Sequence, residues 1–535
     1  MTDTRAQVLI AGGGPAGLGA AIELGWRGVR TCLVEPRITV DDGRPRAKTT
    51  SIRTMEHLRR WGLADRLRAA ASMPVAWSQD VIFCTSLLGT ELTRFCNAFG
   101  LHEGRSEHWA EAGQQVPQPI VERVLRKAVS ELATVDVLVG HTVTAIDHDV
   151  AGVRATVSSA DGSSSVVEAD YLLGCDGAGG ISRAAIGATY TGASGERPNL
   201  NIVFRAPELA RRISLDPAVQ YWIVSAEASG LMGRLDLEDQ WWAIVQHADT
   251  RASGPAPEAL VRSLIGGAAD DLEVQVIATD RWVARMMLVD RYQSGRVFLV
   301  GDAAHLNPPW GGHGYNTCVG DAVNIAWKLA AVIQGWGGPE LLRSYEAERR
   351  PVAAQTIADS AAQDRLLAPS FTDADNARLA TALQAKRSEF HSEGLVLGYH
   401  YAGSPVIVDD GSPAPAHQLT TYHPSTRPGT RLPHTWLPDG RSLYDLLGEG
   451  FTLLRLSETA DPAPLQRAAH IRGVPLRLVD LPELDLADRY GAPLLLIRPD
   501  QHIAWRGDAT ANAVRVIDTA RGALTRRSPA RGRRP

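Results

Sequence analysis

Apolar residues follow two patterns along this chain, and the two patterns alternate. Short continuous apolar runs bounded by glycine or polar residues predict buried strands, whereas apolar positions three and four residues apart predict helices. The chain opens with an apolar run at residues 6–11, a helical pattern at 16–28 and a second apolar run at 31–34. This order predicts a strand–helix–strand unit with parallel strands, which is typical of the start of an open α/β sheet.

Later segments extend this prediction. Helical patterns cover residues 119–129 and the stretch after Gly314, where apolar residues recur at i, i+3, i+4 and i+7. The Asp161-Gly162 pair predicts a turn between two strands. The predicted strands are 142–146, 153–158, 166–173, 202–204, 221–224, 241–245, 296–300, 451–456, 476–479 and 494–497.

Composition narrows the class of protein. The chain has 535 residues, of which 44% are hydrophobic and 21% charged, and its formal net charge is −5. These values are ordinary for a globular protein of several domains, and they give no reason to expect a nucleic acid as partner. The five cysteines are scattered without metal-ligand spacing, so we expect no metal site and a reducing, cytoplasmic compartment.

We expect no secretory signal at the N-terminus and no ordered structure at the C-terminus. The N-terminus leads directly into a predicted strand, and no apolar run is long enough to span a bilayer, so we expect no membrane association. Residues 521–535 are rich in Arg, Gly and Pro. We interpret them as a disordered basic tail rather than a binding patch.

A glycine loop between the first strand and helix carries the first chemical signal. Gly12, Gly14 and Gly17 satisfy G-x-G-x-x-G, with Pro15 and Ala16 between them. Such a loop lets the backbone approach a pyrophosphate, and the helix N-terminus faces its negative charge. Glu35 ends the second strand, where a carboxylate can hold ribose hydroxyls. The loop predicts a dinucleotide but does not distinguish FAD from NAD.

A second motif distinguishes the two. The strand at 296–300 ends in Gly301-Asp302, and a glycine-rich bend follows at residues 308–314, before the long helix. Asp302 can accept hydrogen bonds from ribityl hydroxyls. The bend can present backbone N–H groups to a planar ring, and the helix end favours the negative charge of a reduced flavin. This arrangement predicts FAD.

These residues carry a family resemblance. Residues 301–329 match the pattern GDAAH…P-x-G-G-x-G-x-N…D-A-x-N-x-x-W-K-L, and Asp176-Gly177 supplies a further motif after a strand. The chain resembles single-component FAD-dependent aromatic hydroxylases of the para-hydroxybenzoate hydroxylase and phenol 2-monooxygenase group. Within it, the chain resembles the bacterial polyketide and rebeccamycin-type oxygenases and the dichlorophenol 6-monooxygenases. Gly180, Trp310, His313 and Cys318 depart from the usual pattern.

The resemblance implies which residues hold FAD. It adds an arginine and a glutamine that contact the flavin, at Arg46 and Gln118, to the residues of the two motifs. The full expected set is Gly12, Gly14, Pro15, Ala16, Gly17, Glu35, Arg37, Arg46, Gln118, Val143, Asp176, Asp302, Pro309, Gly312, His313, Gly314, Tyr315 and Asn316.

The resemblance also implies the fold class, α/β with α+β parts. We expect a Rossmann-like FAD-binding domain with an inserted β-sheet substrate domain and a C-terminal thioredoxin-like domain, which has no C-x-x-C motif. Residues after about 430 should then be dispensable for flavin binding. The expected boundaries are 1–73, 116–187 and 290–370 for FAD; 74–115 and 188–289 for substrate; 371–430 for a linker or helical segment; and 431–520 for the thioredoxin-like domain.

The implied reaction is the hydroxylation of a phenolic or related aromatic natural product. NADPH or NADH reduces FAD, O2 forms a flavin C4a-hydroperoxide, and the distal oxygen attacks the ring. The expected partners are an aromatic small molecule and O2, and self-association into a homo-oligomer is left open. Baeyer–Villiger or decarboxylative oxygenation would use the same motifs, and so would a flavin-binding protein without catalysis. A halogenase is disfavoured, because the chain lacks W-x-W-x-I-P.

Residues of the substrate pocket are harder to predict. We expect the pocket between the FAD and sheet domains, and we assign no catalytic base. Three residues are catalytic candidates: His313, which is equally explained by packing, Arg234 and His247. His305 is expected to support the end of its strand. The other pocket candidates are His102, His108, Trp109, Tyr221, Trp222, Trp242 and Gln246.

Overall fold

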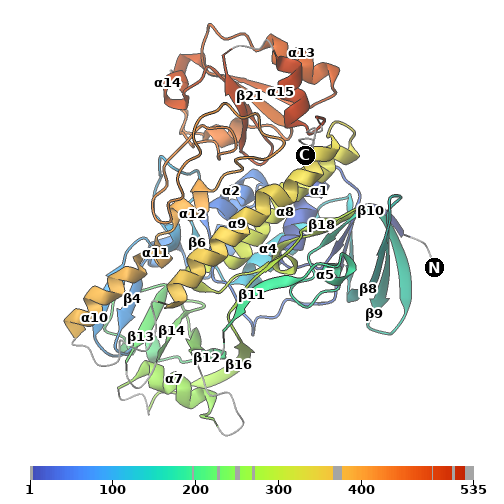
Figure 1. Cartoon of the computed structure of the whole chain (residues 1–535). Coiled ribbons are helices and arrows are strands. Elements are labelled where there is room, and N and C mark those ends of the chain that lie inside the picture. Colours follow the sequence, from blue (N-terminus) through green and yellow to red (C-terminus); the bar gives the residue numbers. More distant parts are fainter. Residues whose placement is uncertain are drawn as a thin grey trace, which may run out of the picture.

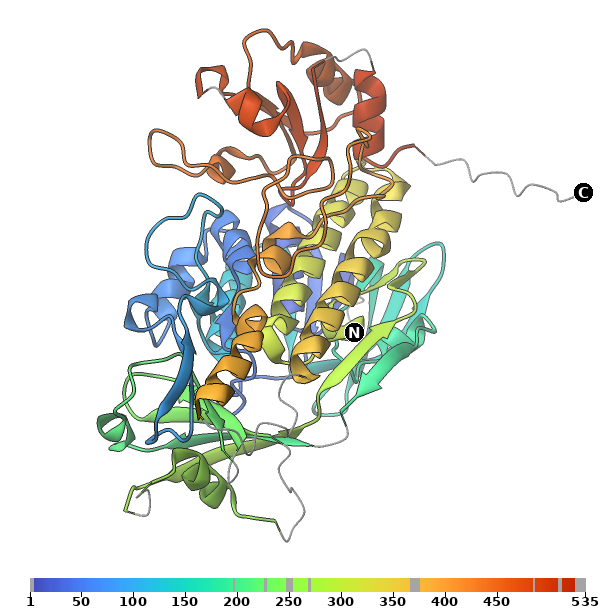
Figure 2. The same cartoon turned by 60° about the vertical axis from the view of Figure 1, so that its left-hand side comes forward.

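The computed structural model of the chain has a large α/β unit in the middle, with a sheet unit on one side and a small α/β unit on the other (Figures 1 and 2). The C-terminal unit, red in Figure 1, and the green sheet unit lie at opposite ends of the molecule. The structure describes residues 4–195, 198–225, 229–246, 254–267, 271–365, 376–484, 486–508 and 512–524.

The middle unit is built on an eight-stranded sheet in the order β18-β19-β10-β1-β2-β7, with β9 paired to β10 and β8 to β9. The strands β1, β2, β7, β10 and β19 are parallel, so their carboxyl ends meet at one edge. Bounds are β1 Thr4–Ala11, β2 Thr31–Glu35, β7 Val135–Val139, β8 His141–His148, β9 Val153–Ser159, β10 Ser164–Gly174, β18 Gln293–Ser294 and β19 Val297–Leu299.

Four helices complete this core. α1 (Pro15–Trp26) packs against α4 (Gln118–Ser130) and α8 (Gly314–Ile333), and α8 packs against α9 (Pro339–Arg365). α1 is buried along nearly its whole length, as its glycine- and alanine-rich sequence allows. Its predicted end at Gly28 was two residues too late, because the helix ends at Trp26 and Gly28 has φ +74°.

Short elements join the middle unit to its neighbours. β3 (Thr49–Thr50) pairs with β6 (Gln114–Gln115), and β17 (Arg285–Val289) pairs with β11 (Tyr190–Ser194) and β20 (His305–Leu306). The remaining helices of this region are α2 Ile52–Arg60, α3 Ala64–Ala70 and α5 Ser182–Ala185.

The sheet unit contains seven strands in the order β16-β12-β15-β14-β13-β4-β5. One face packs on α7 (Pro257–Ile265) and a core that includes Ile202, Tyr221 and Trp241. The other face, with Trp222 and Trp242, turns toward the middle unit. Bounds are β4 Val81–Cys84, β5 Glu91–Phe95, β12 Asn199–Arg205, β13 Gln220–Val224, β14 Ser229–Arg234, β15 Gln240–Val245, β16 Gln275–Trp282 and α6 Leu209–Arg212.

A helical segment then leads to the C-terminal unit. Its helices are α10 (Asn376–Leu383), α11 (Arg387–Phe390) and α12 (Glu393–Gly398), and Leu383 and Phe390 pack into the core of the sheet unit. The predicted linker at 371–430 therefore contributes packed helices where the structure describes it. Residues 371–375 lie outside the described residues, as do residues 525–535 of the predicted tail.

The C-terminal unit has a four-stranded sheet in the order β22-β21-β23-β24, with one parallel and two antiparallel pairs. This mixed sheet with flanking helices confirms the predicted thioredoxin-like domain, and with the other two units it confirms the predicted fold class. Bounds are β21 Phe451–Arg455, β22 Leu476–Asp480, β23 Leu494–Ile497, β24 Ile503–Gly507, α13 Ala463–Ile471, α14 Leu486–Tyr490 and α15 Ala513–Ala520.

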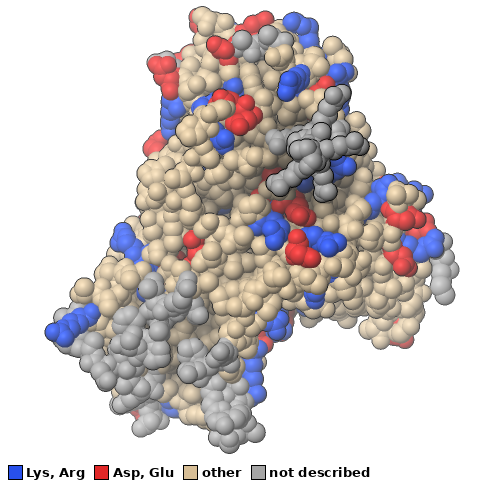
Figure 3. Space-filling model, viewed as in Figure 1, with Lys and Arg blue, Asp and Glu red and all other residues tan. Residues whose placement is uncertain are grey.

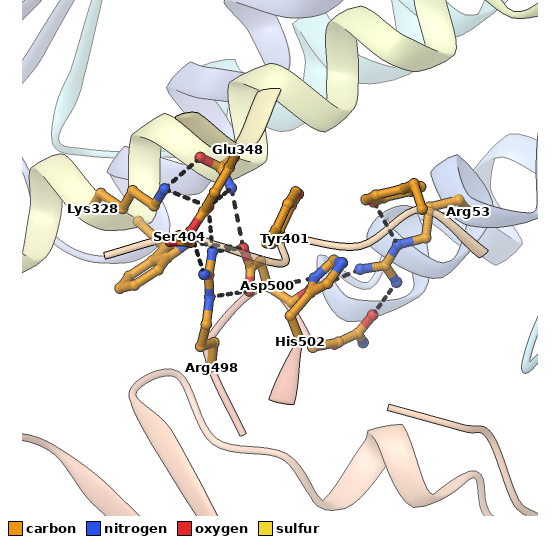
Figure 4. Close-up of polar contacts among 12 residues, drawn as sticks. Arg53, Lys328, Glu348, Tyr401, Ser404, Arg498, Asp500 and His502 are labelled. Carbon is orange, nitrogen blue, oxygen red and sulfur yellow. Dashed lines mark hydrogen bonds and ion pairs between the residues drawn. The ribbon is translucent and has the colours of Figure 1, made fainter. Parts of the chain in front are cut away.

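A buried ionic network joins the C-terminal unit to the middle unit (Figure 4). Glu348 of α9 accepts bonds from Lys328 of α8 at 2.6 Å and from both terminal nitrogens of Arg498 at 2.7 and 2.8 Å. Arg498 also contacts Asp500 at 2.6 Å. Nearby, Arg431 pairs with Glu56 of α2, and all these side chains are buried. The interface is therefore an ionic and apolar core rather than a loose contact.

Charges on the surface are mixed. On the face shown in Figure 3, basic and acidic side chains are interspersed over all three units. Among the described residues, no helix combines the length and apolar character needed to cross a membrane.

Candidate functional site

The glycine loop lies at the carboxyl edge of the parallel strands, between β1 and α1. Gly12 has φ +102°, and a Cβ there would lie 2.4 Å from the Cys175 carbonyl oxygen. A Cβ on Gly17 would lie 1.9 Å from the carbonyl oxygen of Gly12. Around a Cβ on Gly14, by contrast, nothing lies within 4 Å. Gly12 and Gly17 therefore allow the turn and the close packing of the helix, while Gly14 leaves open space for a ligand.

Glu35 stands beside this loop at the end of β2. Its Oε2 accepts a 2.6 Å bond from the backbone N–H of Gly13. Its Oε1 accepts bonds from the backbone N–H and Nε of Arg37, at 2.9 and 2.7 Å. Arg37 also pairs with Glu122 of α4 at 3.0 Å. The carboxylate is thus held at the carboxyl edge of the sheet, where the sequence predicted a ribose contact.

Asp176, at the end of β10, has one satisfied and one unsatisfied oxygen. Its Oδ2 accepts bonds from the backbone N–H and hydroxyl of Ser182 at 2.9 and 2.8 Å. Its Oδ1 is buried without a hydrogen-bond partner among the residues that the structure describes, and burial raises the pKa of the carboxyl group. A Cβ on Gly180 would lie 2.0 Å from the Asp176 carboxyl carbon, which explains the unusual glycine at position 180.

The bend before α8 is shaped by two glycines with positive φ. Gly311 has φ +75° and Gly312 has φ +68°. The side chain of Asn316 donates bonds to the carbonyl oxygens of Gly312 at 2.7 Å and Thr49 at 3.0 Å, and it accepts one from Ser51 at 2.9 Å. Asn316 therefore fixes the bend to β3 rather than facing open space.

Asp302 precedes this bend, and its exposed side chain contacts the Cys318 thiol at 3.5 Å. Behind it, His305 contacts Asp321 of α8 at 2.8 Å, and Arg349 of α9 donates to the same carboxylate at 2.7 Å. Burial opposes the charged form of His305, but Asp321 more than compensates and raises the pKa of the imidazole. His305 thus supports the strand end, as expected.

One cavity of about 1030 Å³ connects the glycine loop, the Asp176 turn, the bend and the seven-stranded sheet. This volume is at the upper end of the range for ligand sites, which is about 300–1,000 Å³. Of the predicted residues, Gly17, His313 and Asn316 do not line it. Those that do are Gly12, Gly14, Pro15, Ala16, Glu35, Arg37, Arg46, Gln118, Val143, Asp176, Asp302, Pro309, Gly312, Gly314 and Tyr315.

The sheet presents an aromatic face to this cavity. Alternate residues of its strands point inward, including Trp222 and Trp242 of inner strands and Trp282 at the end of the edge strand β16. Two amides lie among these indoles. Asn201 Oδ1 accepts a 2.8 Å bond from the Trp282 indole N–H, and Gln220 Oε1 accepts a 3.3 Å bond from that of Trp222.

Several sequence candidates lie elsewhere. Arg234 points to the opposite face of the sheet, where it donates to the carbonyl oxygens of Asp236 and Glu238 and lies over the Trp241 ring. Tyr221 also lies on that face, in the sheet unit's own core. These positions argue against a role of either residue at the cavity. Gln246, His102, His108 and Trp109 do not line the cavity either.

Neither of the two histidine candidates, His313 and His247, is placed at the cavity wall. His313 is buried beside Gly311, and burial lowers the pKa of its imidazole to about 4. Its ring packs under the bend, so packing is the better explanation for it than catalysis. His247 lies outside the described residues.

The cavity also contains residues that the sequence did not single out. Lys48, Asn201, Gln220 and Trp282 line it, yet none belongs to a recognisable motif. The alternation of β12 and β13 could have indicated Asn201 and Gln220, but only with knowledge of which face meets the cavity.

Comparison with known proteins identifies the domains. A family model described as "FAD binding domain" matches residues 5–360. A second model, described as "Aromatic-ring hydroxylase, C-terminal", matches residues 425–527. Together they cover the middle unit, the sheet unit and the thioredoxin-like domain.

Individual relatives match nearly the whole chain. The 2,4-dichlorophenol 6-monooxygenase of Delftia acidovorans is 31% identical over 94% of this chain and 95% of its own length. A structure of chromopyrrolic acid-soaked RebC with bound 7-carboxy-K252c has a TM-score of 0.89 and 32% identity, covering 98% of this chain and 100% of RebC. A ternary complex of aklavinone-11 hydroxylase with FAD and aklavinone has a TM-score of 0.84 and 29% identity, with 98% and 100% coverage.

Proposed function

Because this chain belongs to the family of FAD-dependent aromatic-ring hydroxylases, we propose that it hydroxylates an aromatic natural product with NADPH or NADH and O2. The observation that carries the proposal is the single cavity that extends from the glycine loop to the aromatic face of the sheet. We further propose that residues 1–73, 116–187 and 290–370 hold FAD, and that 74–115 and 188–289 hold the substrate.

The residues present fit FAD. Two residues at the cavity wall carry buried polar atoms, Asp176 Oδ1 and Asn307 Nδ2, that have no partner in the described part of the chain, and the space beside Gly14 is open. A built site with unpaired polar atoms is expected where a polar ligand supplies the missing partners. The sequence-predicted residues that line this cavity are therefore proposed to hold FAD.

When bound, FAD supplies the redox chemistry that activates O2. The chain's own residues bind and orient. The glycine loop and the N-terminus of α1 would hold the pyrophosphate, and Asp302 would accept hydrogen bonds from the ribityl hydroxyls. The indoles of Trp222, Trp242 and Trp282 form an apolar wall that orders a flat substrate and excludes water from it.

The reducing cytoplasm is the proposed compartment. All five cysteines are free thiols in the structure, and both Cys32 and Cys84 are buried. Free cysteines support a compartment in which thiols stay reduced.

The test of the proposed function is oxygenation with labelled oxygen. The purified protein should contain FAD, and aromatic compounds such as hydroxylated naphthoquinones and anthraquinones should stimulate its oxidation of NADPH or NADH. Under ¹⁸O2, the product should gain one labelled oxygen atom, bound to a ring carbon. The proposal is wrong if no compound in such a panel stimulates oxygen uptake, or if label enters a ring-expanded ester instead.

A further inference from the structure

Lysine is rare in this chain, and most of its lysines are buried. Lysine occurs at positions 48, 127, 328 and 386 only. Lys127 is exposed, whereas the other three are at most 8% exposed. Two of those three have a carboxylate partner: Lys328 pairs with Glu348 at 2.6 Å, and Lys386 pairs with Glu389. This is the usual arrangement, because a buried ammonium group without a counter-charge is costly.

Lys48 is the exception. Among the residues that the structure describes, no carboxylate or hydrogen-bond acceptor contacts its ammonium group, which lies 4.0 Å from the centre of the Trp242 ring. Burial, without a compensating charge, lowers the pKa of this amine to about 7. The indole face stabilises a cation only in part, so among the described residues the ammonium form has neither a counter-charge nor a hydrogen-bond acceptor.

The position of Lys48 is defined by the next residue in the chain. Thr49 begins β3, which lies against the bend. A Cβ added to Gly312 of the bend would lie 3.2 Å from the Cβ of Thr49. Lys48 therefore lies at the cavity wall between the bend that is proposed to hold the flavin ring and the aromatic face of the sheet. The Lys48 side chain would therefore contact the substrate rather than the pyrophosphate half of the cofactor.

The two amides on the sheet also present hydrogen-bond donors to the cavity. An indole N–H can only donate, so each amide must direct its oxygen at the neighbouring indole. The amide nitrogens of Asn201 and Gln220 are then left as donors, and both residues line the cavity. Lys48 and the two amides thus all offer N–H groups, which suit a ligand with oxygen acceptors.

We propose that Lys48 binds an oxyanion of the aromatic substrate, a phenolate or an aryl carboxylate, and that the enzyme thereby selects acidic aromatic compounds. This inference rests on the proposed function for the presence of an aromatic substrate in the cavity. For a phenol, the O–H bond breaks and its proton joins the Lys48 amine, while the electron pair stays on oxygen. For a carboxylate, the ammonium form of Lys48 binds directly.

The test is a binding measurement on the FAD-loaded protein without reductant. Each pair of probes shares its ring and differs in whether it carries an acidic oxygen group: 2-naphthoate against 2-naphthamide, and 4-nitrophenol against 4-nitroanisole. Quenching of tryptophan fluorescence reports binding, because Trp222, Trp242, Trp282 and Trp310 line the cavity. We expect about tenfold tighter binding of the acidic member of each pair. The absorbance of bound 4-nitrophenol should also show that its pKa is lowered. Preference in the first pair alone would identify a carboxylate, and preference in the second alone a phenolate.

Variants separate a binding role from a structural one. Lys48→Met keeps the length of the side chain and should abolish both the preference and the lowered pKa of bound 4-nitrophenol, while Lys48→Arg should retain the preference. Lys127→Met, the same change at an exposed site, should behave as the unaltered protein. The inference is overturned if Lys48→Met keeps the preference, or if the unaltered protein shows none. Because the titration needs neither NADPH nor O2, its result is independent of whether oxygenation is observed.

Discussion

At the scale of single residues, the cavity is marked by polar groups with few or no partners among the described residues. Asp176 Oδ1 and Asn307 Nδ2 are buried and unpaired there, and the carboxylate of Asp302 contacts the Cys318 thiol. Native proteins pair nearly all buried polar atoms. Several unpaired atoms around one cavity therefore indicate where a ligand completes the hydrogen bonding.

Replacement of Asp302 should weaken FAD binding without unfolding the protein. Asp302→Ala removes an anionic acceptor, and hydrogen bonds to charged groups contribute roughly 1.5–3 kcal/mol. We expect at least about tenfold weaker binding of FAD by the apoprotein, measured by titration of flavin fluorescence. Asp170→Ala, at a partly exposed carboxylate paired with Arg5, is the control and should bind FAD normally. Unchanged flavin content in Asp302→Ala would contradict the assignment.

Motif residues could be predicted at this scale, but the substrate-facing residues could not. Glycine spacing and an acidic strand end can be read along the chain, because they lie within one strand–loop–helix unit. Which face of a strand meets a cavity depends on its partners in the fold, and a shift of one residue reverses it. The pocket candidates Arg234 and Tyr221 lie on the opposite face for this reason, and Asn201 and Lys48, which line the cavity, were not among the candidates.

At the scale of elements, the glycine loop combines two distinct physical tasks. Gly12 and Gly17 contact backbone, whereas Gly14 faces open space. The three positions are equivalent in the sequence motif but not in the structure. Substitutions at different glycines of this six-residue loop should therefore affect folding in one case and cofactor binding in another.

Gly17→Ala and Gly14→Ala should differ in what they damage. A methyl group at position 17 would lie 1.9 Å from a backbone oxygen, so the unfolding free energy of the apoprotein should fall by about 1–3 kcal/mol. At position 14 the methyl group meets nothing, so stability should be retained while FAD binding weakens, since the space serves the ligand. Urea unfolding and FAD titration measure the two effects. Equal loss of stability in both variants would disprove the distinction.

Elements with strong local patterns were predicted well, and weakly patterned ones were not. The buried runs that became β1, β2 and β19 needed little context, because strands buried on both faces are continuously apolar. The segment between β5 and α4 has few regular elements and contacts two units. Its contacts with the C-terminal unit, such as the carbonyl oxygens of His108 and Ser106 that accept bonds from Arg431 and Trp436, leave no periodic signal.

At the scale of the whole molecule, the C-terminal unit is part of the main core. Trp327 and Trp336, from α8 and its end, pack in one cluster with Phe451 and Leu494 of the thioredoxin-like domain. Glu348 adds the ionic network described above. Burial opposes its ionisation, but Arg498 and Lys328 more than compensate and lower the pKa of the carboxyl group to about 2. Its stabilising contribution is thus complete above pH 4.5 and is lost as the pH falls toward 2.

This interface reverses the expectation that residues after about 430 are dispensable. A chain ending at residue 430 would leave Glu348 without Arg498 and Glu56 without Arg431. We expect this truncated chain to be insoluble or to lose FAD. In the full chain, Arg498→Met should lower the free energy of unfolding by roughly 3–5 kcal/mol. Thermal unfolding followed by flavin fluorescence and by circular dichroism should give one shared transition. Arg467→Met, at an exposed residue of α13, is the control, and two separate transitions would contradict the single core.

The two faces of the seven-stranded sheet have different freedom to change during evolution. Residues such as Ile202, Tyr221 and Trp241 hold the sheet to its own helix, and their neighbours Asn201, Trp222 and Trp242 meet the ligand. Mutations at every second position can therefore change which molecule is accepted, while the alternate positions preserve the scaffold. A lineage with this architecture can acquire new substrates by small steps without passing through unfolded intermediates, and a mutant library confined to the inward positions would follow the same route.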